Sequence, residues 1–242
     1  MKTLCVIPAR YGSQRFPGKP LFPLMGRPMV QWVFRAATES GAFSEVVIAT
    51  DDSRIASVVK DFGGRVVMTD VDHPSGTDRV IEVAQQMPQF DAYVNLQGDE
   101  PLVPTELLRS FVSQLERGRQ DQILTAATDI AAEEMNDFNV VKLVFDTAGR
   151  ACYFSRSAIP HSRSGEFSPE LCFKHIGLYG FTQSALRSIA ELQPHPIEKL
   201  ESLEQLRWLL NGLPIYVHLC EYEAHGIDTL EQALAVEKLL DK

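Results

Sequence analysis

The first 120 residues alternate between short apolar runs and segments of helical spacing. The runs have the length and composition of buried strands, and they fall at Leu4–Ile7, Glu45–Thr50, Arg65–Thr69 and Ala92–Leu96. Helical periodicity fills the intervals between them, at about residues 28–41, 53–62, 77–86 and 104–118. This alternation predicts the α/β class, with a doubly wound, mostly parallel sheet and helices on both of its faces.

The pattern changes after a further strand predicted at Ile123–Ile130. Strand-like segments then follow one another without regular helices between them, at Val140–Phe145, Arg150–Ser155 and Phe173–Thr182. We therefore expect a single domain over residues 1–242 with a smaller antiparallel excursion, a lobe inserted at about residues 131–181. The last elements predicted are helices at Gln183–Leu192 and Ile197–Leu210, a strand at Ile215–Cys220 and a helix that begins at Thr229, which forms a capping box with Gln232.

A basic, glycine-containing loop follows the first strand. Pro8 ends the apolar run because it lacks the N–H that a central strand needs, and the loop then carries Arg10, Arg15 and Lys19. Backbone N–H groups approach an anion closely at glycine, and the cations neutralise its charge. The loop predicts a polyphosphate site; the alternative is a surface turn whose charges only keep the protein soluble.

The distribution of charge along the chain favours the anion site. The first 38 residues hold six Lys and Arg residues and no carboxylate, although the whole chain has a net charge of −9. A basic pole in an acidic protein attracts small anions, whereas the overall charge argues against non-specific binding of nucleic acid. The ligand expected is therefore a small anionic molecule.

Two common nucleotide-binding motifs are excluded by spacing. Five residues separate Gly12 from Gly18, where a Walker A motif has four, and Pro20 stands where its Ser or Thr would bind magnesium. The chain also lacks a G-x-G-x-x-G sequence. A P-loop NTPase and a dinucleotide-binding Rossmann enzyme are thus both disfavoured.

The four cysteines form no C-x-x-C pair, and no window approaches ~18 consecutive apolar residues. We expect reduced cysteines in or near the core, no signal peptide or membrane-spanning helix, and a cytoplasmic protein.

Several residues are candidates for chemistry. Asp99 follows a predicted strand inside a tight turn, where it suits Mg²⁺ bound against phosphates or, alternatively, a structural turn. Asp228 precedes a helix that Thr229 already caps, so its carboxylate suits the same metal. His175 fits either a site or a packed core, and Arg156 either a carboxylate clamp or the surface. Glu204 and Gln205 are uninformative by themselves.

Together these motifs resemble a known family. IPARYGSQRFPGKPL, HPSGTDR, NLQGDEP, YFSRSAIP, KHIGLYGF, LEQLRWL and GIDT occur in the order seen in the 3-deoxy-manno-octulosonate (Kdo) cytidylyltransferase family, over essentially the whole chain. The resemblance implies a nucleotide-diphospho-sugar transferase-like fold and a cytosolic homodimer of lipopolysaccharide biosynthesis that couples CTP to Kdo. Phe16, where leucine is common, and the charged segment 221–225 depart from the family pattern.

The resemblance also implies roles for individual residues. Arg10, Arg15 and Lys19 would bind the triphosphate, and Asp99 and Asp228 would hold Mg²⁺. The cytidine would lie against Pro8, Ala9, Ser75, Gly76, Thr77 and Gln97, and the sugar acid against Arg156, His175, Tyr179, Glu204 and Gln205. Two alternatives stay open: a cytidylyltransferase for another acidic sugar, of sialic or amino-Kdo type, and a non-catalytic nucleotide-binding module.

Overall fold

The computed structural model describes residues 1–12, 16–118, 121–165 and 169–240. The chain forms two compact units. Unit 1 comprises Met1–Glu116 and Ala224–Lys242, and unit 2 comprises Arg117–Glu223. Unit 1 is therefore built from both ends of the chain, and each unit is described by itself. The predicted single domain with a lobe at about 131–181 stays a prediction.

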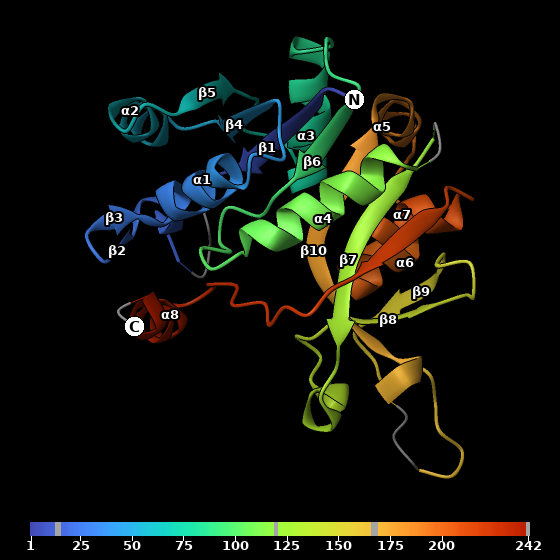
Figure 1. The fold of residues 1–242 in the computed structure, drawn as a ribbon. Coiled ribbons are helices and arrows are strands. Elements are labelled where there is room, and N and C mark those ends of the chain that lie inside the picture. The colour runs from blue at the N-terminus through green and yellow to red at the C-terminus, as the bar shows by residue number, and fades with distance from the viewer. Residues whose placement is uncertain (13–15, 119–120, 166–168, 241–242) are drawn as a thin grey trace. The chain divides into compact units, whose positions relative to one another are not determined.

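Unit 1 contains a parallel sheet in which β1 lies between β4 and β6, and β5 pairs with β4 (Figure 1). Its strands are β1 (Thr3–Pro8), β4 (Glu45–Thr50), β5 (Arg65–Met68) and β6 (Ala92–Asn95), and its helices are α1 (Met29–Ser40), α2 (Ser53–Asp61), α3 (Gly76–Gln86), α4 (Thr105–Glu116) and α8 (Leu230–Leu240). The short strands β2 (Pro23–Leu24) and β3 (Arg27–Pro28) pair separately, after the 3₁₀ helix η1 (Lys19–Leu21). The predicted doubly wound α/β class is confirmed.

The strand order of unit 1 places a binding crevice beside β1. The chain moves outward from β1 through β4 to β5 and then crosses back to β6 on the other side of β1. Because crossovers are right-handed, this reversal puts α3 on the sheet face opposite α1 and α2. The loops that leave β1 and β6 both lie at the carboxyl edge of the sheet, which is where ligands bind in such folds.

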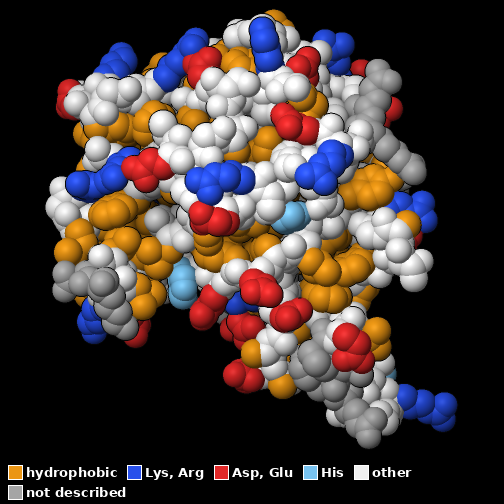
Figure 2. Space-filling view, viewed as in Figure 1, with side chains coloured by type: hydrophobic (Ala, Val, Ile, Leu, Met, Phe, Trp, Pro, Cys, Tyr) orange, Lys and Arg blue, Asp and Glu red, His pale blue; other side chains and the backbone are white. Residues whose placement is uncertain are grey.

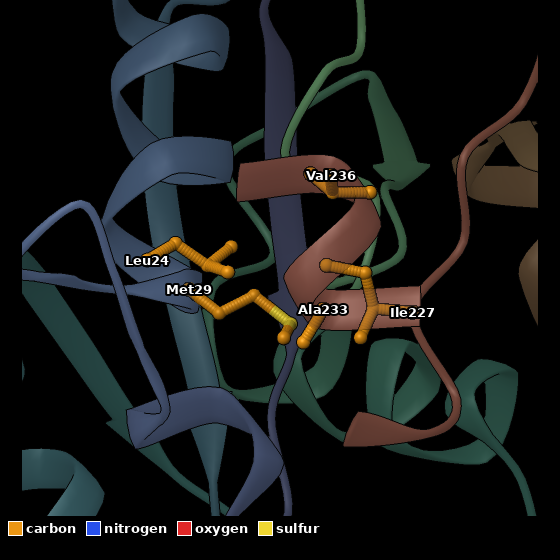
Figure 3. Close-up of a cluster of buried hydrophobic side chains, with 5 residues drawn as sticks. All are labelled: Leu24, Met29, Ile227, Ala233 and Val236. Carbon is orange, nitrogen blue, oxygen red and sulfur yellow. The ribbon is translucent and has the colours of Figure 1, made fainter. Parts of the chain in front are cut away.

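The C-terminal segment completes the core of unit 1. Leu24, Met29, Ile227, Ala233 and Val236 form a buried hydrophobic cluster, in which α8 packs against the segment around β2, β3 and the start of α1 (Figure 3). The predicted capping box is present, since Thr229 Oγ1 accepts from the N–H of Gln232 at 3.3 Å and Gln232 Oε1 accepts from the N–H of Thr229 at 3.0 Å. This packing fixes where the residues just before α8 lie.

Unit 2 contains a mixed sheet with the order β11, β7, β10, β8, β9. β11 runs parallel to β7, and the remaining pairs are antiparallel. The elements are β7 (Ile123–Asp129), β8 (Lys142–Phe145), β9 (Ala151–Ser155), β10 (Phe173–Thr182), β11 (Ile215–Leu219), α5 (Gln183–Ala190), α6 (Pro196–Glu201), α7 (Gln205–Leu210) and the 3₁₀ helices η2 (Ala132–Asn136) and η3 (Pro169–Leu171).

Two expectations about unit 2 are wrong. The single helix predicted at 197–210 is two helices, because Ser202 adopts a left-handed conformation with φ of +53° and ends α6. Cys152 is exposed rather than near the core, although all four cysteines are free as expected. It lies on β9, which pairs with β8 alone and so forms the border of this sheet.

The structure carries two features that bear on partners. No helix among the described residues is long and apolar enough to cross a bilayer. Lys and Arg side chains lie among Asp and Glu side chains on the face shown in Figure 2, so charge of both signs is mixed there. That face differs from the broad basic surface on which non-specific nucleic-acid binding depends.

Candidate functional site

A cavity of about 520 Å³ lies in unit 1 at the crevice beside β1. It is polar, and four parts of the chain converge on it: the loop after β1 with η1, the segment from the end of β5 into α3, the turn after β6, and the residue two positions before α8. The described residues that line it are Pro8, Ala9, Arg10, Gly12, Lys19, Pro20, His73, Ser75, Gly76, Arg79, Gln97, Gly98, Asp99 and Asp228. The site thus lies where the strand order reverses.

The backbone allows β1 and β6 to end close together. The N–H of Leu96 donates to the carbonyl of Val6 at 3.0 Å, so the hydrogen bonding between β1 and β6 continues one residue past the end of β6. A side-chain carbon on Gly98 would lie only 2.8 Å from the carbonyl oxygen of Pro8. Position 98 therefore requires glycine for the turn to pass β1, and this close passage brings Asp99 to the cavity.

One lysine joins the two carboxylates that the sequence singled out. Lys19 Nζ lies 2.5 Å from Asp99 Oδ2 and 3.3 Å from Asp228 Oδ1, and the lysine side chain is only 13% exposed. A backbone hydrogen bond also joins the two segments that carry these carboxylates. The N–H of Ile227, the residue before Asp228, donates to the carbonyl of Asp99 at 3.0 Å. Residues more than 120 positions apart in the chain thus meet at one ammonium group.

The carboxylate pair fits a magnesium ion. Mg²⁺ prefers oxygen ligands and usually takes one or two carboxylates together with substrate phosphates. Within the described part of the chain no group of three or more His, Cys, Asp or Glu side chains forms a metal-binding cluster, so the donor set does not resemble a zinc site. Lys19 balances only one of the two negative charges of Asp99 and Asp228, and a divalent cation would balance the charge that remains.

The nucleotide candidates lie at three places: Pro8 and Ala9 at the end of β1, residues 75–77 at the start of α3, and Gln97 after β6. Ser75 caps α3, because its hydroxyl accepts from the N–H of Asp78 at 3.2 Å, and the helix N-terminus favours an anion nearby. Thr77 is buried and is not part of the described lining. It receives a hydrogen bond of 3.4 Å from the amide of Asn95, which in turn accepts one of 3.4 Å from Gln97.

Two ionisable side chains of the cavity wall were missed by sequence reasoning, those of Arg79 and His73. Arg79 is 4% exposed, pairs with Asp51 at 3.2 Å and donates to the hydroxyl of Thr69; burial lowers the pKa of its guanidinium. His73 Nε2 lies 2.5 Å from Glu82 Oε2. A helical spacing argument could have found Arg79, which is three residues beyond Gly76 and so shares its side of α3.

Arg10 lines the cavity as expected. Arg15, the remaining predicted phosphate ligand, lies outside the described residues.

The sugar candidates belong to unit 2, and four of them gather between β10 and α7. The His175 ring lies 5.4 Å from the ring of Tyr179 and makes an edge contact of 5.2 Å with Phe154. The pKa of the Tyr179 hydroxyl is raised by burial and by the charge of Glu204, which places that carboxylate nearby. Gln205 follows Glu204 as the first residue of α7 and is buried.

This group contains polar atoms that the protein itself does not satisfy. The Tyr179 hydroxyl, the Gln205 amide nitrogen and the Trp208 indole nitrogen are buried and make no hydrogen bond within the described residues. Such atoms are costly unless a water or ligand pairs with them. A polyhydroxylated acid offers the required partners.

His175 is neutral in the folded protein. Burial lowers the pKa of its imidazole to about 3, and its Nε2 lies 2.9 Å from Thr125 Oγ1. When the Thr125 hydroxyl donates to the carbonyl of Leu178 at 3.1 Å, His175 Nε2 is the donor to the hydroxyl oxygen. The register of β10 against β7 shifts between Ile176 and Tyr179, yet the rings of His175 and Tyr179 lie 5.4 Å apart, on the same face of the strand.

Arg156 is separate from that group. Its guanidinium donates to the backbone carbonyls of Glu201 at 2.7 Å, Phe138 at 3.0 Å and Ser202 at 3.4 Å. The buried ammonium of Lys142 binds the neighbouring carbonyls of Asp137, Val140 and Arg156 at 2.6–2.8 Å, and burial lowers its pKa. In this structure Arg156 therefore joins the backbone around Phe138 to the end of α6. Its expected role of binding the carboxylate of the sugar acid stays a prediction.

Comparison with known proteins identifies the family. Residues 4–217 match the family model described as "Cytidylyltransferase". The 3-deoxy-manno-octulosonate cytidylyltransferases of Thermodesulfovibrio yellowstonii and Leptospira biflexa are 45% and 46% identical; the alignments cover 100% and 93% of this chain, and 99% and 91% of those proteins.

Solved structures agree. A CMP:2-keto-3-deoxy-manno-octonic acid synthetase complexed with CTP superimposes with a TM-score of 0.95 at 38% identity, over 100% of this chain and 99% of that one. A putative glucose-1-phosphate thymidylyltransferase of Bacillus anthracis, with a TM-score of 0.68 and 14% identity over 98% of this chain and 94% of that one, shares the fold alone. The chain belongs to the 3-deoxy-manno-octulosonate cytidylyltransferase family.

Proposed function

We propose that this protein is an enzyme that transfers the cytidylyl group of CTP to Kdo, giving CMP-Kdo and diphosphate. The observation that carries the proposal is the cavity at the switch point of the sheet, where Lys19 joins Asp99 and Asp228 beside the basic loop. Family membership supports the choice of both substrates.

The reaction requires positioning and charge neutralisation more than covalent chemistry. The anomeric hydroxyl of Kdo attacks the α-phosphorus of CTP, and the bond to the β,γ-diphosphate breaks in line with it. Lys19 and Arg10 neutralise the charge that develops on the leaving diphosphate, and the buried Arg79 adds positive charge to the same wall. No covalent enzyme intermediate is needed.

Asp99 and Asp228 would hold Mg²⁺, which when bound supplies charge neutralisation at the phosphates and lowers the pKa of a coordinated hydroxyl. The carboxylates themselves orient Lys19, because both accept from its ammonium. That orientation keeps the lysine directed into the cavity before CTP arrives.

In unit 2, Tyr179, Glu204 and Gln205 bind the sugar hydroxyls in this proposal, and His175 supports the site as a neutral hydrogen-bond donor. The buried Tyr179 hydroxyl and Gln205 amide nitrogen, which no other described residue satisfies, support the assignment. The proposal also includes a homodimer, a cytoplasmic location and a role in lipopolysaccharide biosynthesis, all of which rest on the family resemblance.

The decisive experiment measures diphosphate release from CTP and Mg²⁺ with Kdo, a sialic acid or a hexose 1-phosphate as acceptor. Release with Kdo alone supports the proposal. Release only with another acid keeps the chemistry and replaces the sugar, whereas CTP binding without release from any acceptor indicates a non-catalytic binding module.

Lys19→Met serves as the site variant and the exposed Lys60→Met on α2 as its matched control. We expect Lys19→Met to lower kcat by about 10²- to 10³-fold, the usual cost of removing one transition-state charge contact, with a smaller effect on CTP binding. An unchanged single-turnover rate would exclude the proposed role of Lys19.

A further inference from the structure

The aromatic ring of Tyr11, outside the cavity lining, is in close contact with an arginine from α2. The guanidinium carbon of Arg54 lies 3.4 Å from the centre of the Tyr11 ring, within the range of a cation–π contact. Arg54 is itself held by two hydrogen bonds to Asp52, from Nε at 3.0 Å and from Nη2 at 2.6 Å. Asp52 also caps α2, since it accepts from the N–H of Arg54 at 2.9 Å. The ring therefore contacts a cation that is anchored to a helix end.

The same ring contacts the far end of the basic loop. The N–H of Gly18 donates to the carbonyl of Tyr11 at 2.9 Å, so the two residues join the ends of the segment between them. A side-chain carbon on Gly18 would lie 3.2 Å from two carbons of the Tyr11 ring, and the φ of Gly18 is +72°. Both the conformation and the close ring contact call for glycine at this position.

The neighbours of these two residues are the phosphate-binding cations. Arg10 directly precedes Tyr11, and Lys19 directly follows Gly18; both line the cavity, whereas Tyr11 and Arg54 do not. A shift of the Tyr11–Gly18 junction would therefore displace the backbone from which both cations extend. Small displacements of catalytic groups are costly, because a misplacement of about 1 Å can lower a rate about 100-fold.

We propose that Tyr11, held by Arg54, is a positioning residue that sets the spacing of Arg10 and Lys19 for the phosphates of CTP. The proposal deepens the proposed function and rests on CTP as the ligand of this cavity. It assigns no contact with substrate to either Tyr11 or Arg54.

The test compares binding of CTP and CMP by calorimetry with steady-state kinetics. Tyr11→Leu removes the ring, and we expect it to weaken CTP binding and lower kcat/KM for CTP about tenfold. Arg54→Met removes the cation, and we expect it to weaken CTP binding and lower kcat/KM for CTP about fivefold. CMP affinity and the KM for the sugar acid should stay within twofold, because CMP lacks the β- and γ-phosphates and unit 2 binds the sugar.

Two controls separate positioning from general damage. Tyr11→Phe keeps the ring and should restore most of the loss. Arg35→Met removes another exposed arginine, which pairs with Glu39 and lies 6.0 Å from the Trp32 ring, and should change CTP binding less than twofold. In the double variant Tyr11→Leu/Arg54→Met the loss should not exceed that of Tyr11→Leu alone, since the two side chains act through one contact.

The proposal would be overturned if the losses of CTP affinity in Tyr11→Leu and Arg54→Met added up in the double variant. It would also be overturned if these two variants bound CTP as tightly as Arg35→Met does, or if Tyr11→Leu weakened the binding of CTP and CMP equally. Its failure is distinguishable from failure of the proposed function. If no acceptor supports diphosphate release but Tyr11→Leu still weakens CTP relative to CMP, the positioning role stands and the transferase activity does not.

Discussion

Acidification should destabilise unit 2 through His175. Its imidazole has a pKa of about 3 in the folded protein because of burial, against ~6.5 for an unfolded chain. Between these two values the unfolded state binds a proton that the folded state does not, so stability falls as the pH falls. At about 1.4 kcal/mol per pH unit, lowering the pH from 7 to 5 should cost about 2 kcal/mol.

The matched variant is His175→Phe, which keeps a ring against Phe154 and Tyr179 but removes the titrating nitrogen. Thr125 retains a partner in the carbonyl of Leu178. We therefore expect the difference in unfolding free energy between wild type and variant to change by about 2 kcal/mol between pH 7 and pH 5.

Urea unfolding followed by the fluorescence of Trp208 measures this difference. Trp208 is fully buried in unit 2 and touches Tyr179, and the Trp32→Phe substitution leaves it as the only tryptophan of the chain. His218, whose pKa burial also lowers, contributes equally to both proteins. Parallel pH dependences in the two proteins would refute the reasoning, because they would mean that His175 takes up its proton in the folded state.

Three further predictions concern single side chains. Lys142→Met should lower the unfolding free energy by about 3 kcal/mol, since it leaves three partly buried carbonyls without the ammonium that donates to them; a change below about 1 kcal/mol in urea unfolding would contradict this. Gly98→Ala should lower both the melting temperature and the affinity for CTP, because its methyl group meets the carbonyl of Pro8; calorimetry showing wild-type values would exclude the close passage. Asp228→Asn should raise the Mg²⁺ concentration needed for half-maximal activity about tenfold or more, and an unchanged metal titration would remove Asp228 from the metal site.

Local patterns predicted the elements that bear on the site. The strands at Glu45–Thr50 and Phe173–Thr182 begin and end where expected, because apolar runs bounded by turn residues define buried strands well. The capping of the last helix by Thr229 was also predictable, since both hydrogen bonds lie within four residues. The alternation of elements also implied that the basic loop and Asp99 both follow the carboxyl ends of parallel strands, where the structure brings Lys19 and Asp99 together.

What the sequence left open depends on contacts between distant residues. The helix break at Ser202 has no local signal, because the periodicity continues across it. Arg156 fastens carbonyls that lie 18 to 46 positions away, and spacing does not reveal such partners. Arg79 pairs with Asp51, 28 positions earlier in the chain, and spacing does not reveal that contact either.

The return of the chain to unit 1 has a consequence for biosynthesis. Asp228 and the α8 residues of the core cluster leave the ribosome only after all of unit 2 has been translated. A nascent or prematurely terminated chain already has the basic loop, Lys19 and Asp99 but lacks the second carboxylate. Proteolytic trimming before residue 228 would likewise remove Asp228 from the cavity wall, together with the α8 residues of the core cluster, so we expect an unfinished or clipped chain to be inactive.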